Sequence, residues 1–136
     1  MKTYQKISLV LLALAMILSA CGGGGAQSDA DPVAILQALE AAFDARDPDA
    51  IAALYAEDGY EVNGRGTFTG RDEIRELYAE MVQKATIDCR NYAANGNTVT
   101  YECIMNRANL LTGEQYEAVV ENGKIKSNVR TGVFSP

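Results

Sequence analysis

The sequence predicts an α+β domain in which three helices and a short hairpin precede a four-stranded antiparallel meander. Apolar residues recur at helical spacing between about residues 31 and 81. After that point, apolar and polar residues alternate with the period of two that is typical of strands. Turn sequences interrupt this alternation at Asn95-Gly96-Asn97, Thr112-Gly113 and Asn122-Gly123. The 136 residues therefore hold one domain, with its helices mostly before its strands.

The first two helices share a start signal, an aspartate followed by proline at the first helical position. Asp31-Pro32 opens a helix to about Arg46, and Asp47-Pro48 opens a shorter one. Apolar residues at helical spacing give each helix one buried face. These residues are Ile35, Leu36, Leu39, Ala42 and Phe43 in the first helix, and Ile51, Leu54 and Tyr55 in the second.

A hairpin and a third helix follow. Residues 60–62 and 67–69 form the expected extended pair, joined by a glycine-rich turn at 63–66. Thr69 and Asp72 fit a capping box at the start of the third helix. Its buried face is formed by Ile74, Leu77, Tyr78 and Met81.

The three later turns fix a strand register that can be tested against charge placement. A turn at Gly96 sets Cys89 opposite Cys103, Arg90 opposite Glu102 and Asn91 opposite Tyr101. A turn at Thr112-Gly113 sets Arg107 opposite Ala118 and Asn109 opposite Tyr116. A turn at Asn122-Gly123 sets Val120 opposite Ile125 and Glu121 opposite Lys124. A slip of one residue would bury the charges, which favours these registers.

In these registers one face of the meander is mostly apolar and the helices must cover it. It collects Ile87, Cys89, Val99, Tyr101, Cys103, Met105, Arg107, Asn109, Tyr116, Ala118, Val120, Ile125, Ser127, Val129 and Val133. The outer face collects Asp88, Arg90, Glu102, Glu117, Glu121, Lys124, Lys126 and Arg130. Arg107 is then the only charge on the inner face, and no acidic residue falls there.

The N-terminus has the pattern of a secretory leader. Lys2 and Lys6 precede an apolar run at 7–18 that suits a signal peptide and is short for a membrane span. The run ends in Leu18-Ser19-Ala20-Cys21, which resembles a bacterial lipobox. We expect residues 1–20 to be removed, Cys21 to carry lipid and the glycine-rich residues 21–30 to tether a domain at 31–136. The alternative is an ordinary secretory peptide with a cysteine there by chance.

Composition excludes several functions. The chain has no histidine, so Ser-His-Asp and Cys-His catalysis are absent and the commonest zinc ligand is missing; we expect no metal and no cofactor. From Cys21 onward 10 basic and 18 acidic residues give a formal charge of −8, which disfavours nucleic acid as a partner. Cys89 and Cys103, set opposite each other in an exported protein, predict a disulfide; two free buried thiols are the alternative.

Three segments together resemble the nuclear transport factor 2-like superfamily, specifically its SnoaL-like members. They are residues 45–58 (ARDPDAIAALYAED), Gly70-Arg71-Asp72-Glu73-Ile74, and Asn122-Gly123-Lys124-Ile125 before the last strand. The resemblance covers about residues 32–134. It implies a cone, in which a curved antiparallel sheet wraps around three N-terminal helices and encloses an apolar pocket. Its members include isomerases, cyclases, dehydratases and ligand binders, so the fold alone leaves the function open.

The catalytic residues of known branches are missing. An ungapped match to the ketosteroid isomerase branch puts Leu39 at the tyrosine position and Asn63 at the aspartate position. Leucine donates no hydrogen bond, and asparagine is no general base. The scytalone dehydratase pattern needs histidine. The polyketide cyclase pattern needs a pocket acid. We read Tyr55, Tyr60 and Tyr78 mainly as packing residues, and Asp58 as a helix terminator or backbone-binding residue.

The leading hypothesis is therefore a lipid-anchored domain of the bacterial cell envelope, facing outside the cytoplasm, that binds a small, mostly apolar molecule. Arg107 would hold its carboxylate or other polar end, unless Arg107 instead pairs with Glu40 or Asp44 at the rim. An isomerase, cyclase or hydrolyase is one alternative. A homodimer or envelope interaction module, docking through Ile104, Leu110, Val119 and Phe134 on the outer sheet face, is another. The pocket candidates are Arg107, Asn109, Tyr101, Tyr116, Asn63 and Tyr60.

Overall fold

The computed structural model describes residues 30–136, and the predicted leader, Cys21 and most of the tether lie outside them. The order of elements confirms the prediction. The helices are α1 (Pro32–Asp44), α2 (Pro48–Leu54) and α3 (Gly70–Lys84). The strands are β1 (Tyr55–Asn63), β2 (Gly66–Thr69), β3 (Ala85–Asn95), β4 (Thr98–Arg107), β5 (Leu110–Glu121) and β6 (Lys124–Phe134).

Helix starts follow the predicted caps in two cases out of three. The Asp31 side chain accepts a hydrogen bond from the Val33 amide at 3.0 Å, and Asp47 accepts one from the Ala50 amide at 2.9 Å. The acidic partner predicted for the capping box at α3 is wrong. Thr69 makes no side-chain cap, and Glu73 rather than Asp72 accepts its backbone amide at 2.7 Å.

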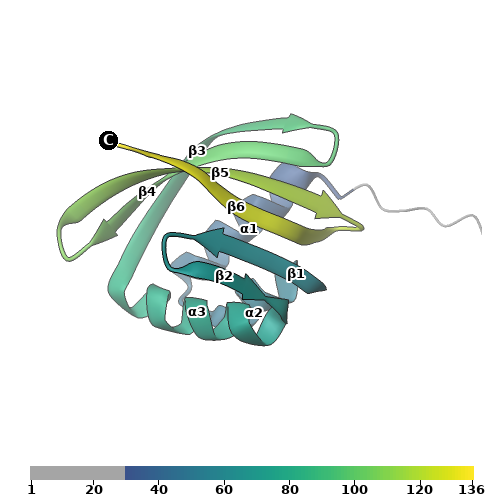
Figure 1. Ribbon diagram of the computed structural model, residues 1–136, viewed down its shortest axis with the longest axis horizontal. Helices are drawn as coiled ribbons and strands as arrows, with labels where there is room; N and C mark the ends of the chain where they lie inside the picture. Colours follow the sequence, from purple (N-terminus) through teal and green to yellow (C-terminus); the bar gives the residue numbers. More distant parts are fainter. Residues whose placement is uncertain (1–29) are drawn as a thin grey trace, which may run out of the picture.

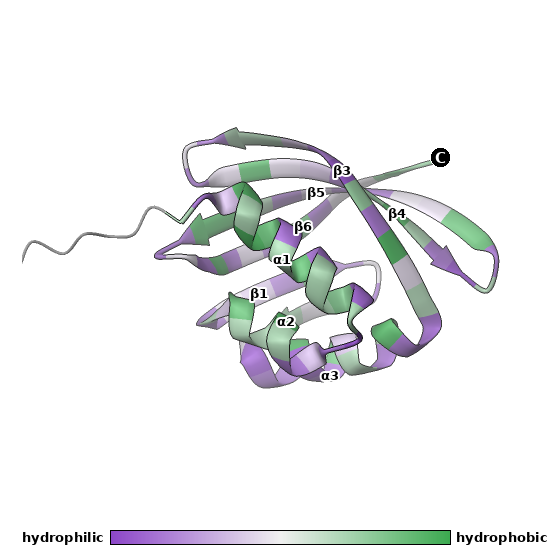
Figure 2. Ribbon diagram, turned by 180° about the vertical axis from the view of Figure 1, so that it is seen from behind, coloured by the Kyte–Doolittle hydropathy of each residue, from purple (hydrophilic) through white to green (hydrophobic). Residues whose placement is uncertain are grey.

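The six strands form one sheet in the order β2-β1-β6-β5-β4-β3. All neighbours are antiparallel except β1 and β6, which run parallel and join the early hairpin to the end of the meander. The sheet is strongly curved, and the helices lie within its curve (Figures 1 and 2). The apolar faces of α1 and α3 pack there against the strands through Leu36, Phe43, Ile74 and Leu77. No helix within residues 30–136 is long and apolar enough to cross a membrane.

The first and third turns of the meander have the predicted registers, with one irregularity. Arg90 lies opposite Glu102 and Glu121 opposite Lys124, as expected. The predicted pairing of Asn91 with Tyr101 is wrong, because the register shifts between Arg90 and Ala93. Asn91 adopts a left-handed backbone with φ of 57° and bulges out of the ladder.

The second turn is not at Thr112-Gly113. Consecutive left-handed residues, Ala108 and Asn109, connect β4 to β5, and Arg107 lies opposite Leu110. Such a two-residue turn matches the twist of the strands it joins. Gly113 is instead inside β5, where a Cβ would lie 2.5 Å from the Phe134 ring. Glycine at this position leaves room for the ring, and it does not mark a turn.

This correction and a second bulge change the composition of the inner face. The longer hairpin brings Glu114 into the sheet interior, where it is 7% exposed. A register shift between Gln115 and Tyr116 sets Tyr116 opposite Arg130. Arg130, predicted on the outer face, forms an ion pair with buried Glu114. The inner face therefore carries both signs of charge, and Arg107 is not the only charge there.

The predicted disulfide between Cys89 and Cys103 is confirmed. It joins β3 to β4 across a non-local pair of residues 14 apart, with a Cα–Cα distance of 4.0 Å. Cys103 is buried, and the Cys89 amide donates to Glu40 of α1, so the bridge joins these strands where the helix packs on them.

We predict that replacing both cysteines, Cys89→Ala with Cys103→Ala, lowers the free energy of unfolding by about 3 kcal/mol, because closing a loop of this length restricts the unfolded chain. Urea unfolding of the oxidised protein measures the change. The wild-type protein under reducing conditions serves as the control and should match the double variant. Equal stability of the oxidised wild type and the variant would contradict the prediction.

Candidate functional site

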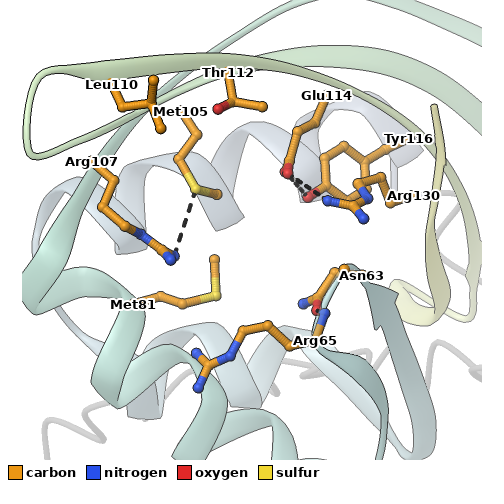
Figure 3. Close-up of a pocket in the computed structure, with 11 residues that line it drawn as sticks. Asn63, Arg65, Met81, Met105, Arg107, Leu110, Thr112, Glu114, Tyr116 and Arg130 are labelled. Atoms are coloured by element: carbon orange, nitrogen blue, oxygen red, sulfur yellow. Dashed lines mark hydrogen bonds and ion pairs between the residues drawn. The ribbon is translucent and has the colours of Figure 1, made fainter. Parts of the chain in front are cut away.

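A pocket of about 270 Å³ opens between the β4–β5 hairpin, α3 and the β1–β2 turn (Figure 3). Its walls come from segments far apart in the sequence, brought together by the curvature of the sheet. The lining residues are Asn63, Gly64, Arg65, Met81, Met105, Arg107, Leu110, Thr112, Glu114, Tyr116 and Arg130.

Three arginines surround this pocket, and two of them are neutralised. Arg65 forms an ion pair with Glu80 of α3, and Arg130 Nη1 lies 2.9 Å from Glu114 Oε1. Within residues 30–136, Arg107 forms no ion pair, and its Nη2 lies 3.9 Å from the Met105 sulfur. The predicted alternative pairing of Arg107 with Glu40 or Asp44 does not occur. Arg107 instead extends over the pocket from the end of β4 (Figure 3).

Glu40, the suggested partner of Arg107, is used elsewhere. Its carboxylate accepts hydrogen bonds from the Cys89 amide at 2.8 Å and from the Tyr92 hydroxyl at 3.1 Å. These contacts fix α1 to β3 and leave the pocket rim without that acid.

Glu114 and Tyr116 form the back wall of the pocket. The Tyr116 hydroxyl donates to Glu114 Oε2 at 2.5 Å, while Arg130 occupies the other carboxylate oxygen. The expectation that no acid lies on the inner face is therefore wrong. Burial, together with the negative charges of Glu61 and Glu114, raises the pKa of Tyr116 far above its ordinary value, so its hydroxyl remains a donor.

Gly64 makes room for the Arg130 guanidinium. A Cβ at position 64 would lie 2.5 Å from Arg130 Nη2, so a side chain there would displace the guanidinium. The glycine in the β1–β2 turn thus allows Arg130 to lie between this turn and Glu114.

A second, much smaller cavity of about 20 Å³ lies behind the pocket. Met81, Met105, Glu114 and Tyr116 line both spaces and separate them. The remaining walls of this inner cavity are Leu39, Phe43, Tyr78, Ile87, Tyr101, Cys103 and Asn128.

Glu61 of β1 is a buried carboxylate that lies behind the inner cavity, and sequence reasoning missed it. It is 2% exposed and accepts hydrogen bonds from the Tyr55 hydroxyl at 2.6 Å and the Asn128 amide at 2.9 Å, with the Tyr78 hydroxyl at 3.4 Å. Removal from water raises its pKa to about 7, although hydrogen bonds from these groups and from Asn63 offset part of the shift.

A signal for Glu61 was present in the sequence. Alternate residues of a strand share a face, so Glu61 lies on the same face as Asn63, two positions from the aspartate position of the isomerase branch. Tyr55 and Tyr78, expected to serve mainly in packing, are buried and also bind this carboxylate. Asp58 neither ends a helix nor caps one, because it lies in β1 and pairs with Lys126.

The predicted pocket residues are distributed unevenly. Arg107, Asn63 and Tyr116 line the pocket, whereas Tyr101 lines the inner cavity and stacks on Tyr116 with ring centroids 5.3 Å apart. Asn109 is exposed in the β4–β5 turn, and Tyr60 lines neither space. Leu110, predicted on the outer sheet face, instead lies at the pocket mouth. In the described part of the chain, no group of three metal-ligating acids or cysteines occurs.

Comparison with known proteins agrees with this architecture. The SnoaL-like domain family matches residues 36–127, which is more than half of the chain. The chain belongs to the SnoaL-like domain family. Among curated proteins, none matches this sequence significantly.

Solved structures place this SnoaL-like domain in the nuclear transport factor 2-like fold. An NTF2-like protein of unknown function from Cytophaga hutchinsonii is 14% identical, with a TM-score of 0.66 over 76% of this chain and 88% of that one. A Catenulispora acidiphila protein with a ketosteroid isomerase-like fold, in complex with trimethylamine, is 22% identical, with a TM-score of 0.65 over 72% and 84%. A candidate polyketide cyclase from Xanthomonas campestris is 22% identical, with a TM-score of 0.62 over 73% and 87%.

These comparisons confirm the predicted fold class, a curved sheet around N-terminal helices. At such low identities the neighbours establish the fold and not the chemistry. What this SnoaL-like domain binds depends on the residues of its own pocket.

We predict that Glu61 makes stability depend on pH. Its carboxyl is protonated in both states below about pH 4.5, its ordinary pKa. As pH rises toward 7 the unfolded chain loses this proton first, so the free energy of unfolding falls by up to about 3 kcal/mol and then levels off. Glu61→Gln should remove that decline, measured by urea unfolding between pH 5 and 8.

Glu57→Gln, an exposed change in the same strand, is the matched control and should keep the wild-type decline. An unchanged decline in Glu61→Gln would show that Glu61 does not titrate in this range.

Proposed function

We propose that this SnoaL-like domain binds a small, mostly apolar molecule that carries one negatively charged group, such as a carboxylate. The observation behind this proposal is the Arg107 guanidinium, which extends over a largely apolar pocket and forms no ion pair within residues 30–136. A guanidinium offers several N–H donors in a geometry that matches a carboxylate.

The charges around the pocket favour a monoanion. Glu80 and Glu114 already neutralise Arg65 and Arg130, so Arg107 contributes one uncompensated positive charge. Asn63 adds an amide at the same mouth. A second negative charge on the ligand would meet Glu114 on the back wall without a free cation to balance it.

The volume sets the size of the ligand. About 270 Å³ corresponds to the space of roughly nine water molecules at about 30 Å³ each. That is near the small end for ligand sites, so the pocket suits a molecule of roughly ten non-hydrogen atoms. Met81, Met105 and Leu110 provide apolar contact for its body.

An isomerase or cyclase is the second candidate function, and Glu61 is the observation that favours it. A carboxyl with a pKa near 7 suits proton transfer at neutral pH. Glu61 does not line the pocket, however, and the acid that does, Glu114, is held by Arg130 and Tyr116. Binding is therefore the better supported function for these residues.

The proposal includes the cell-envelope location predicted from the N-terminal sequence. Lipid on Cys21 would hold the domain outside the cytoplasm, where the Cys89–Cys103 disulfide is favoured. Intact-mass and native mass spectrometry of the purified protein test both points together. The intact mass shows whether acyl chains are attached, and the native mass shows whether a small molecule purifies with the domain.

We predict that Arg107→Met weakens binding of benzoate, an aromatic monoanion within the size that the pocket allows, by about tenfold to a hundredfold, because a charge-assisted hydrogen bond is lost. Calorimetric titration measures the affinity. Arg75→Met, which removes an exposed arginine of α3 outside the pocket, is the matched control and should bind as the wild type does. Equal affinities in all three proteins would remove Arg107 from the binding site.

A further inference from the structure

Two of the four side chains that separate the pocket from the inner cavity are flexible methionines. Met81 projects from α3 and Met105 from β4, and each lines both spaces. Figure 3 shows the two thioethers approaching each other across the pocket. Methionine is unbranched and adapts its rotamers at low cost, so a ligand can displace these side chains more easily than aromatic or branched ones.

Every polar group that lines the inner cavity is already hydrogen bonded. The Tyr101 hydroxyl donates to Asn128 at 2.9 Å, and the Asn128 amide donates to Glu61. The Tyr78 hydroxyl faces Glu61, and the Tyr116 hydroxyl donates to Glu114. The described residues contain no buried side-chain nitrogen or oxygen atom without a partner.

This arrangement gives the two spaces opposite preferences. An anionic group in the inner cavity would find no free donor and would lie near the carboxyls of Glu61 and Glu114. An alkyl chain would contact Leu39, Phe43 and Ile87 and would break no hydrogen bond. The mouth, by contrast, offers Arg107.

We propose that the ligand is an aliphatic carboxylate whose head binds Arg107 and whose chain passes between Met81 and Met105 into the inner cavity. This inference rests on the proposed function, because it assigns the ligand class and orientation for the same pocket. The inner cavity of about 20 Å³ has room for about one methyl or methylene group, so the end of a longer chain gains affinity there that a short carboxylate, held in the mouth alone, does not gain.

Calorimetric titration of the purified protein with butyrate, hexanoate and octanoate at pH 7 tests the proposal. Affinity should rise about threefold to fourfold for each methylene that leaves water for the outer pocket or the inner cavity, so octanoate should bind at least tenfold more tightly than butyrate. Leu39→Phe, which fills the inner cavity from α1, should remove the part of this gain that comes from the inner cavity, about threefold to fourfold, and leave butyrate affinity unchanged.

Leu36→Phe is the matched control. It makes the same change on the same buried face of α1 but lines neither space, so the octanoate gain should persist. Ile87→Phe fills the inner cavity from β3 and gives an independent test if Leu39→Phe does not fold.

The outcomes separate the two proposals. Equal affinity of the wild type for butyrate and octanoate would overturn the inner-chain site while leaving anion binding intact. A chain-length gain that stays undiminished in both filled variants would place the chain end elsewhere and would also overturn it. Failure of all three carboxylates to bind would overturn the ligand class and count against the proposed function itself.

Discussion

The pairing of β4 with β5 is the constraint on which the site depends. The turn at Ala108 and Asn109 fixes this register and sets Tyr101 opposite Tyr116. With that register, Glu114 reaches the buried wall and Arg107 lies at the rim. A turn four residues later along β5, at Thr112-Gly113, would have put Glu114 beside the turn and Arg107 well inside the sheet. One hairpin thus places Arg107, which forms no ion pair within residues 30–136, at the mouth, and leaves an interior whose polar groups are already hydrogen bonded.

The interior holds two acids by different means. Glu114 forms an ion pair with Arg130, and Gly64 leaves the space that Arg130 needs. Glu61 has only neutral donors, so burial raises its pKa toward 7. Both acids use the hydroxyls of surrounding tyrosines, and this leaves those hydroxyls unable to donate to a ligand. The polar end of a ligand is therefore bound at the mouth, and the interior binds its apolar part.

Regular elements could be predicted from sequence because their signals are local. Asp-Pro starts, helical spacing and strand alternation identified each element, and Asn-Gly turns fixed two of three hairpins. The Cys89–Cys103 disulfide followed from the register of the first hairpin.

The site was harder to predict because it depends on irregularities. Ala108 has no intrinsic preference for a left-handed backbone, whereas Gly113 resembles a turn residue but accommodates Phe134. The bulge beside Tyr116 turned Arg130 inward. Glu61 was hidden because one of its partners, Asn128, reaches it only through the parallel pairing of β1 with β6.

Methyl NMR of the methionines is the most direct test of whether the mouth of the pocket binds the anionic head of the ligand and the interior binds its apolar chain. The chain has four methionines, of which Met81 and Met105 form the wall between the two spaces. With ¹³C-methyl methionine and ¹⁵N-arginine labels, octanoate should shift the Met81 and Met105 methyl signals and the Arg107 side-chain signal with one common midpoint. Movement of the Arg107 signal while both methionine signals stay fixed would contradict the account.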